Sequence, residues 1–194
     1  VKIDPSNSEI LVKGKTVTKG YYKRPDENEK SFTEDGFFRT GDAGRIEDGV
    51  LYFTERIKDL YKTSNGKYIA PQAIEGLVGS DRYIEQIAVI ADQRKFVSAL
   101  IVPNFQVLEE YVARKGLSFN SREEMVSNPD IIRMFEARIE VCQKNLAPFE
   151  KIKRITLLVE PFTMEGKELT DTLKLRRRVI AEKYAEQIEA MYKE

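Results

Sequence analysis

The sequence predicts an α+β protein, and two observations indicate this class. Before about residue 57, short apolar segments alternate with glycine-containing turns, which is typical of β-strands joined by tight connections. From Lys58 onward, apolar runs of strand length are interspersed with segments whose apolar residues repeat at helical spacing. We therefore expect two parts, residues 1–57 and 58–194, with a hinge where the pattern changes.

The first part is expected to consist mainly of short strands. Residues 10–12 and 49–54 are the strand candidates, and the second is entered through a turn at residues 47–49. Between them, the polar segment 24–32 predicts either a short helix or an exposed loop.

The second part begins with a predicted hairpin and a helix. Two short apolar segments flank Ser64-Asn65-Gly66, and Asn-Gly is a strong short-range hairpin signal. Pro71 then suits the first turn of a helix that runs to Val78. The hairpin is therefore expected to lead directly into that helix.

Three further strands and three helices are expected after this helix. The segments 84–91, 97–102 and 152–159 are apolar and of strand length. A polar stretch, 118–128, separates the first two helices. The residues that mark the helices are Phe105, Leu108, Tyr111 and Val112 in the first, which ends near Gly116, then Ile131, Phe135, Ile139, Cys142 and Leu146, and finally Ile180, Tyr184, Ile188 and Met191.

The amino-acid composition argues against several kinds of binding and catalysis. The 32 basic and 32 acidic residues give zero net charge, so no overall field attracts nucleic acid or an anionic membrane. Histidine is absent, which removes the usual general base and the commonest metal ligand, and we expect no metal site. The single cysteine, Cys142, excludes an intrachain disulfide and lies on an apolar stripe, where a core residue is expected rather than a nucleophile.

The cysteine content and the start of the sequence lead to expectations about where the protein resides and whether it is part of a longer one. One unpaired cysteine fits a reducing compartment, and no segment resembles a membrane span or a signal peptide. We expect a cytoplasmic protein, with peripheral association with the inner face of the membrane left open. Because the chain opens on Val1 without an initiator methionine, we expect a piece of a longer protein.

A carboxylate between glycines is the first candidate for chemistry. Asp42 lies between Gly41 and Gly44, where the backbone can approach a ligand closely. A carboxylate in such a turn can accept hydrogen bonds from paired ribose hydroxyls. The alternative is an ordinary turn whose aspartate bonds its own backbone.

Three cations form the second candidate. Arg56, Lys58 and Lys62 share one face if the chain is extended, so they could converge on a phosphate or a carboxylate. The alternative is a solvated charged strand edge that prevents unwanted pairing.

Lys174 is the third candidate. It follows a predicted helix start, with Thr170 or Asp171 as the cap, and it offers three donors and a full charge to an oxyanion. The arginines at 176–178 fall in the first turns of that helix, where cations oppose the macrodipole. Local helix stability does not explain them, which leaves either a ligand-binding role or a salt-bridged surface.

Four segments carry a family resemblance: residues 20–25, 32–42, 56–62 and 172–177. In sequence and order they resemble motifs of the adenylate-forming (AMP-binding) superfamily. The surroundings of Lys174 and the segment 62–71 are similar to those of bacterial long-chain fatty acid–CoA ligases. The resemblance implies that residues 1–57 are the last strands of a large N-terminal domain. Residues 58–194 would be the small mobile C-terminal domain, with a β-hairpin and a mixed sheet packed with helices.

The resemblance implies nucleotide-binding roles. Asp42 is expected to bind the ribose hydroxyls of ATP or of the acyl-adenylate, with Arg56 beside it. Lys58, or the pair Lys58 and Asp59, is expected at the interdomain hinge and near the nucleotide. Lys62 is expected near the nucleotide and the face where the thiol enters.

The resemblance also implies a two-step reaction. Lys174 is expected to bridge the substrate carboxylate and the α-phosphate of Mg-ATP while the acyl-adenylate forms. Gly66 is expected to let the pantetheine arm of CoA pass close to the backbone when the thiol displaces AMP. Mg²⁺ is expected to be bound mainly by the N-terminal domain, which is also the expected protein partner. Fatty acid, ATP and CoA are the expected small-molecule ligands.

Because the phosphate-binding loop and the acyl-binding portion of this family lie outside residues 1–194, we expect this piece alone to be inactive. Two alternatives stay open. One is a non-catalytic binding or regulatory module with the same fold, and the other is an enzyme that activates a different carboxylic acid.

Overall fold

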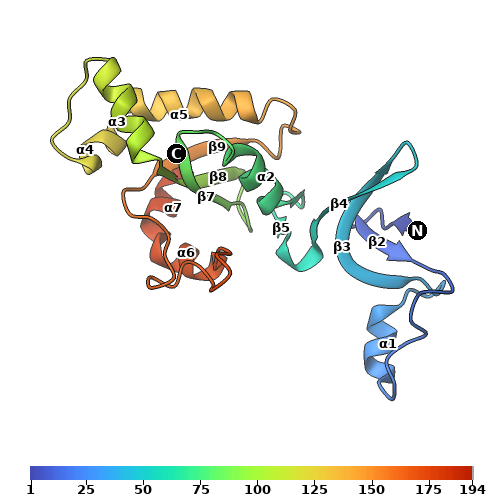
Figure 1. Cartoon of the computed structure of the whole chain (residues 1–194). Helices are drawn as coiled ribbons and strands as arrows, with labels where there is room; N and C mark the ends of the chain where they lie inside the picture. Colours follow the sequence, from blue (N-terminus) through green and yellow to red (C-terminus); the bar gives the residue numbers. More distant parts are fainter. Residues whose placement is uncertain (194) are drawn as a thin grey trace. The chain divides into compact units, whose positions relative to one another are not determined.

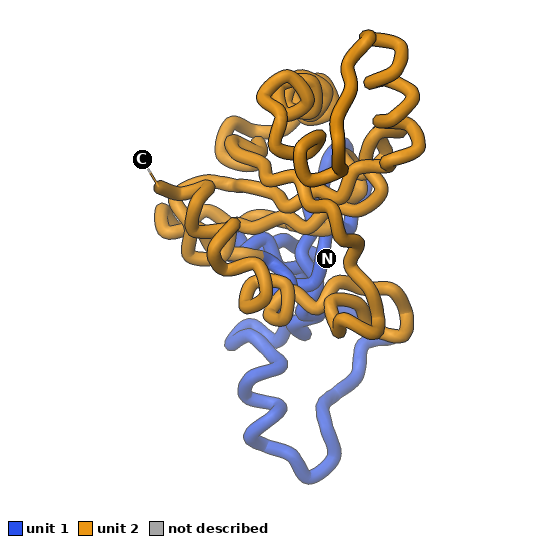
Figure 2. The backbone as a smooth tube through the Cα atoms, turned by 90° about the vertical axis from the view of Figure 1, so that its left-hand side faces the viewer, with its two compact units in different colours: residues 1–60 blue, residues 61–194 orange. Residues whose placement is uncertain are grey.

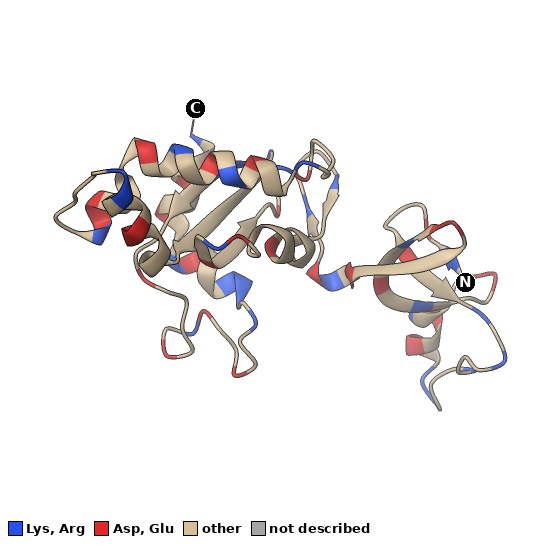
Figure 3. Cartoon of the chain, turned by 45° about the horizontal axis from the view of Figure 1, so that its top comes forward, with Lys and Arg blue, Asp and Glu red and all other residues tan. Residues whose placement is uncertain are grey.

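The computed structural model describes residues 1–193 and divides into two compact units, Val1–Leu60 and Tyr61–Glu194, called here unit 1 and unit 2 (Figure 2). Figure 3 shows basic and acidic residues interspersed along the chain in each unit. No helix of residues 1–193 is both long enough and apolar enough to cross a membrane.

Unit 1 is a four-stranded antiparallel sheet with a short helix (Figure 1). The strand order is β1-β2-β3-β4, and the helix connects β2 to β3. The predicted strands at 10–12 and 49–54 and the short polar helix are confirmed. The elements are β1 (Lys2–Ile3), β2 (Glu9–Val12), α1 (Pro25–Ser31), β3 (Phe38–Glu47), β4 (Val50–Arg56) and the 3₁₀ segment η1 (Ile57–Asp59).

Local sequence explains the long β3–β4 hairpin. Asp48 and Gly49 both have positive φ, 50° and 78°, which makes a two-residue turn of type I′ that matches strand twist. Farther along the hairpin, a bulge falls between Ala43 and Gly44. A Cβ on Gly44 would meet the carbonyl oxygen of Tyr52 at 2.5 Å, so the close strand approach there requires glycine.

Unit 2 contains a small hairpin and a mixed three-stranded sheet (Figure 1). β7 and β8 are antiparallel, and β9 pairs with β8 in parallel. The hairpin strands are β5 (Tyr61–Lys62) and β6 (Tyr68–Ile69), and the sheet strands are β7 (Ile84–Ile90), β8 (Val97–Pro103) and β9 (Ile152–Leu157). The predicted α+β class, with a hairpin and a mixed sheet packed with helices, is confirmed.

Helices cover both faces of this sheet, which explains why the central strand β8 is buried along its whole length. Ile87 and Val89 face one core with α2, α3, α4 and α5, whereas Ala88 and Ile90 face a second core with α6 and α7. Successive strand residues point to opposite faces, so both sets are buried. The helices are α2 (Pro71–Val78), α3 (Phe105–Arg114), α4 (Arg122–Ser127), α5 (Pro129–Cys142), α6 (Arg177–Lys183) and α7 (Ala185–Tyr192).

Three sequence predictions require correction. The polar stretch 118–128 contains a helix, α4, because the Ser121 side chain accepts a hydrogen bond from the amide of Glu124 and caps it. α5 ends at Cys142, so Leu146 packs against the core from beyond the helix. The predicted terminal helix is two helices, because the backbone leaves the helical region at Tyr184.

Candidate functional site

Strand pairing in unit 1 brings Asp42 and Arg56 together. They are direct partners in the β3–β4 register, and Arg56 Nε lies 3.6 Å from Asp42 Oδ1. The Arg56 side chain is 74% exposed and that of Asp42 is 33% exposed. Both groups therefore remain accessible to a ligand.

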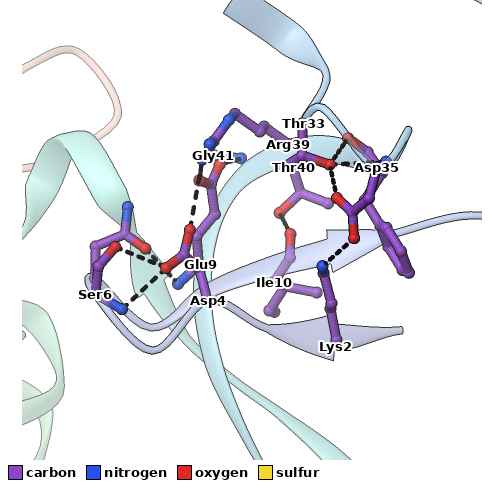
Figure 4. A network of polar contacts seen from close by, with 12 residues as sticks. Lys2, Asp4, Ser6, Glu9, Ile10, Thr33, Asp35, Arg39, Thr40 and Gly41 are labelled. Carbon is purple, nitrogen blue, oxygen red and sulfur yellow. Dashed lines mark hydrogen bonds and ion pairs between the residues drawn. The ribbon is translucent and has the colours of Figure 1, made fainter.

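A buried carboxylate shapes the turn that presents Asp42 (Figure 4). Glu9, only 5% exposed, accepts the amide of Gly41 at 3.0 Å and the guanidinium of Arg39 at 2.9 Å. The Thr40 hydroxyl donates to the carbonyl of Ile10 at 2.8 Å and accepts the amide of Asp42 at 3.1 Å. The threonine hydroxyl caps this turn, so the Asp42 carboxylate is directed to Arg56 instead.

The three cations at 56, 58 and 62 do not lie on one extended strand. β4 ends at Arg56, and the chain turns through η1, where Leu60 donates its amide to the carbonyls of Arg56 and Ile57. Lys58 and Asp59 are exposed in η1 within unit 1, whereas Lys62 belongs to unit 2. The expectation of a single strand face is wrong because a 3₁₀ turn interrupts it.

Lys62 and Gly66 belong to the β5–β6 hairpin. The Gly66 amide donates to the Thr63 carbonyl at 2.9 Å, and the Thr63 amide donates to the Lys67 carbonyl at 2.9 Å. Gly66 has a φ of 75° and Asn65 stays at negative φ, so the loop has three residues and ends in a left-handed glycine. No atom lies within 4 Å of the place where a Gly66 Cβ would be, which leaves that side of the loop open.

The hairpin is held by the turn between β7 and β8. The amide of Ser64 donates to the carbonyl of Arg94 at 3.0 Å, and the amide of Gln93 donates to the carbonyl of Lys62 at 2.9 Å. The ammonium of Lys62 is exposed and lies 5.6 Å from the centre of the Tyr68 ring. Backbone bonds therefore fix the loop while its cation stays accessible.

Lys174 lies on a second hairpin and not inside a helix. The Thr170 amide donates to the Lys174 carbonyl at 2.8 Å, and the Leu173 amide donates to the Thr170 carbonyl at 2.8 Å. The Lys174 amide donates to the Thr170 hydroxyl at 3.0 Å. The expectation that Thr170 or Asp171 caps a helix is wrong, because α6 begins at Arg177.

The side chain of Lys174 is exposed, and its ammonium has no carboxylate partner among residues 1–193. Leu173 beside it has a φ of 58°, a conformation that leucine rarely adopts. An exposed cation that directly follows a strained turn residue is suited to an external anion.

The arginines after Lys174 are explained by ion pairs. Arg177 donates two hydrogen bonds to Glu75 of α2, at 2.7 and 2.8 Å, and Glu75 also accepts the amide of Val89. Burial alone would lower the pKa of Arg177, but the bonds and charge of Glu75 raise it above its ordinary value. Arg178 pairs with Glu182 on the surface. These pairs favour the salt-bridge alternative for the two arginines.

Sequence reasoning missed two carboxylates that support the Lys174 segment, Glu75 and Glu168. Glu75 lies 102 residues from its partner Arg177, so no local pattern indicates the pair. Glu168 is fully buried and pairs with Lys183. The only local signal was a glutamate within the motif before Lys174.

Cys142 is half-buried at the edge of the first core, and burial raises the pKa of its thiol. It lines a cavity of about 760 Å³ between α3 and α5, together with residues such as Tyr111, Met134 and Arg138. None of the predicted site residues lines this cavity. Among residues 1–193, no three Cys, Asp or Glu side chains are grouped so that they could hold a metal ion.

Comparisons with known proteins give a consistent result. Residues 58–194 match the family model described as the AMP-binding enzyme C-terminal domain. The long-chain-fatty-acid–CoA ligase FadD15 of Mycobacterium tuberculosis is 34% identical over 188 residues, which cover 96% of this chain and 31% of that protein. Long-chain-fatty-acid–CoA ligase 1 of Schizosaccharomyces pombe is 36% identical over 98% of this chain and 29% of its own length.

The solved structures agree with the sequence comparison. The A domain of a carboxylic acid reductase from Segniliparus rugosus, in complex with AMP and a co-purified carboxylic acid, has a TM-score of 0.67 at 26% identity. The match covers 95% of this chain and 28% of that one. This chain thus spans roughly a third or less of the proteins that it matches, and it belongs to the AMP-binding enzyme C-terminal domain family.

Proposed function

We propose that this chain is the C-terminal portion of an ATP-dependent long-chain fatty acid–CoA ligase. The observation that carries the proposal is an exposed Lys174, which has no carboxylate partner within residues 1–193 and lies on a hairpin held by ion pairs at both ends. The relatives that cover almost the whole chain at 34–36% identity bear that ligase name. Residues 1–57 belong to the end of the large domain in this proposal, and 58–194 form the mobile domain with its hinge at Lys58 and Asp59.

The first step is adenylation. A fatty carboxylate oxygen attacks the α-phosphate of ATP, a phosphorus–oxygen bond forms, and pyrophosphate leaves. Negative charge accumulates where carboxylate and phosphate meet, and the Lys174 ammonium stabilises it there. Asp42 accepts the ribose hydroxyls, Arg56 lies beside it, and the nucleotide also meets the exposed cations Lys58 and Lys62.

The second step forms the thioester. The thiolate of CoA attacks the acyl carbon, a carbon–sulfur bond forms, and AMP leaves with the bridging oxygen. The open side of the loop at Gly66 supports its role in letting the pantetheine arm pass. Within residues 1–193 no three Cys, Asp or Glu side chains are grouped so that they could hold a metal ion, and no step here is assigned to Mg²⁺.

The proposed partners are the preceding part of the same polypeptide, a fatty acid, ATP and CoA. A cytoplasmic location, with peripheral attachment to the membrane, completes the proposal. Vesicle flotation of the full-length protein tests the attachment, and recovery only in the soluble fraction would reject it.

The role of Lys174 is tested by Lys174→Ala in the full-length protein. Adenylation, followed as acyl-adenylate and pyrophosphate in a single turnover, should fall by about 100-fold or more. Conversion of supplied acyl-adenylate and CoA should largely survive. Equal loss of both half-reactions would reject this role.

The inactivity of the piece alone is tested with the purified 194 residues, which should form no acyl-CoA. Detectable product would contradict the proposal. The carboxylic acid reductase relatives leave a second candidate, the activation of another acid. Turnover of the full-length protein on acids of increasing chain length decides between the two.

A further inference from the structure

A buried carboxylate lies at the base of the Lys174 hairpin. Glu168 has no exposed surface, whereas the ammonium with which it pairs, on Lys183 of α6, is 48% exposed. Burial alone would raise the pKa of Glu168, but hydrogen bonds from Lys183 and from backbone amides lower it below its usual value. The group is therefore a charged carboxylate inside the fold.

Glu168 connects three segments of the chain. Its carboxylate accepts the amide of Thr163 at 3.3 Å and a short hydrogen bond from Lys183. Its own carbonyl accepts the amide of Arg176 at 2.7 Å, the first bond across the base of the hairpin. Leu169 and Leu175 form the next bridge toward Lys174. One residue thus joins the preceding turn, the hairpin and α6.

The turn before the hairpin is shaped around this carboxylate. A Cβ placed on Gly166 would collide with the carboxylate of Glu168, so a larger residue there would displace this carboxylate. Gly166 also donates its amide to the Thr163 hydroxyl at 2.9 Å. The segment 163–168 therefore packs closely around the carboxylate.

Stability alone does not explain a charge at this place. Removing a carboxylate from water costs several kcal/mol, and a buried ion pair often gives no more stability than apolar residues of the same volume. The pair instead fixes the orientation of the hairpin, because its hydrogen bonds are satisfied in one geometry of the hairpin.

We propose that Glu168 is a positioning residue for Lys174: by fixing the base of the hairpin against α6, it sets where the ammonium is delivered for adenylation. The proposal rests on the proposed role of Lys174. Misplacing a reacting group by about 1 Å can cost a factor of 100 in rate, so small loosening is sufficient.

The test compares two isosteric variants of the full-length protein, Glu168→Gln and Asp81→Asn. Asp81 is the matched control because its side chain is 8% exposed and is bonded by Arg138 of α5, whose helix packs on the other face of the sheet. Both variants remove one buried carboxylate charge from one ion pair with an arginine or lysine.

Three quantities are measured: amide hydrogen exchange at Thr170 and Lys174, single-turnover adenylation, and thioester formation from supplied acyl-adenylate and CoA. For Glu168→Gln we expect faster exchange at both amides, adenylation slower by about 10- to 100-fold, and thioester formation within about twofold of the wild type. Asp81→Asn should change neither the exchange nor the ratio of the two half-reactions.

Unchanged exchange in Glu168→Gln, or equal loss in both half-reactions, would overturn the positioning role. If Glu168→Gln does not fold, Lys183→Gln removes the half-exposed donor instead and is judged by the same criteria. Lys174→Ala is measured in parallel. If it spares adenylation, the proposed role of Lys174 fails and the positioning role with it; if it abolishes adenylation while Glu168→Gln does not slow it, only the positioning role fails.

Discussion

Two hairpins of unit 2 have the same hydrogen-bond pattern but are held in different ways. In both, a threonine amide donates to the carbonyl of a lysine four residues later, and the threonine hydroxyl accepts that lysine's amide. The first runs from Thr63 to Lys67 and the second from Thr170 to Lys174. Each closes through a left-handed residue just before the lysine, at Gly66 and Leu173.

The two hairpins differ in the residue that adopts the positive φ and in the contacts that hold the hairpin in place. Gly66 adopts its positive φ freely, and backbone bonds to the β7–β8 turn hold its loop. Leu173 is strained by about 1 kcal/mol, and side-chain ion pairs of Glu168 and Arg177 hold its hairpin from both ends. The first loop therefore has open space on one side at Gly66, whereas the second holds the exposed Lys174 between two ion pairs, and the proposed roles of these two residues rest on this difference.

The largest expected effect on stability comes from breaking the ion pair between Arg177 and Glu75, which holds the C-terminal end of the Lys174 hairpin. Arg177→Ala leaves the Glu75 carboxylate, whose side chain is 11% exposed, without its partner. We expect a loss of about 3 kcal/mol in the free energy of unfolding, measured by urea denaturation. Exchange at the Thr170 amide should rise, while exchange at the Thr63 amide changes only with global stability.

The matching double variant Glu75→Gln/Arg177→Met separates charge from packing. It should recover most of the lost stability, because no unpaired charge remains and the glutamine still offers an acceptor to the amide of Val89. A loss below about 0.5 kcal/mol in Arg177→Ala would contradict an anchoring role for this pair.

The next largest effect is expected when Gly66 of the first hairpin is replaced by leucine, the residue found at the equivalent position, 173, of the second hairpin. Gly66→Leu forces leucine into a φ of 75° and should cost about 1–2 kcal/mol of unfolding free energy. The side chain would occupy the open side of the loop, so thioester formation should slow more than adenylation.

Gly76→Ala is the control, because Gly76 lies inside α2 at an ordinary φ with open space around it. This variant should stabilise the fold by about 0.5 kcal/mol. Equal slowing of both half-reactions in Gly66→Leu would contradict the difference between the loops.

The ion pair of Glu168 should appear in the pH dependence of stability. Its folded-state pKa is below the usual 4.5, because the bonds from Lys183 and the backbone outweigh the effect of burial. Its contribution is therefore fully present above pH 4.5 and is lost as the pH falls through the lower folded-state pKa. Urea denaturation in this acid range should show a steep fall for the wild type and a shallower one for Glu168→Gln. Identical slopes would contradict a charged Glu168.

The smallest expected effect is on Leu173→Gly. Relief of about 1 kcal/mol of strain is offset by the extra entropy that glycine has in the unfolded chain. The free energy of unfolding should change by less than about 0.5 kcal/mol, while exchange at the Lys174 amide increases. A large destabilisation would show that the leucine side chain contributes to holding the hairpin.

Much of the fold could be predicted because local patterns coincide with burial. The apolar run 84–91 predicts a strand, and both of its faces are buried under helices. Ser121 followed by Glu124 is a capping signal that could have revealed α4. Asn65-Gly66 predicts a hairpin, but the type of loop depends on the φ of Asn65, which no pattern determines.

The site was less predictable for two physical reasons. A threonine hydroxyl that accepts a nearby amide serves equally in a helix cap and in a hairpin, so Thr170 indicated the wrong structure. Leucine disfavours the left-handed region, so local preference opposed the turn that Leu173 makes. The anchors of that turn join residues far apart, as Glu75 and Arg177 show, and only the packed fold brings them together.

The most direct measurement compares both half-reactions in Lys174→Ala and Gly66→Leu, each in the full-length protein under single-turnover conditions. If the two hairpins serve different steps, the first variant loses adenylation and keeps most thioester formation, and the second shows the reverse order. A single common ratio of the two rates in both variants would contradict the division of labour between the hairpins.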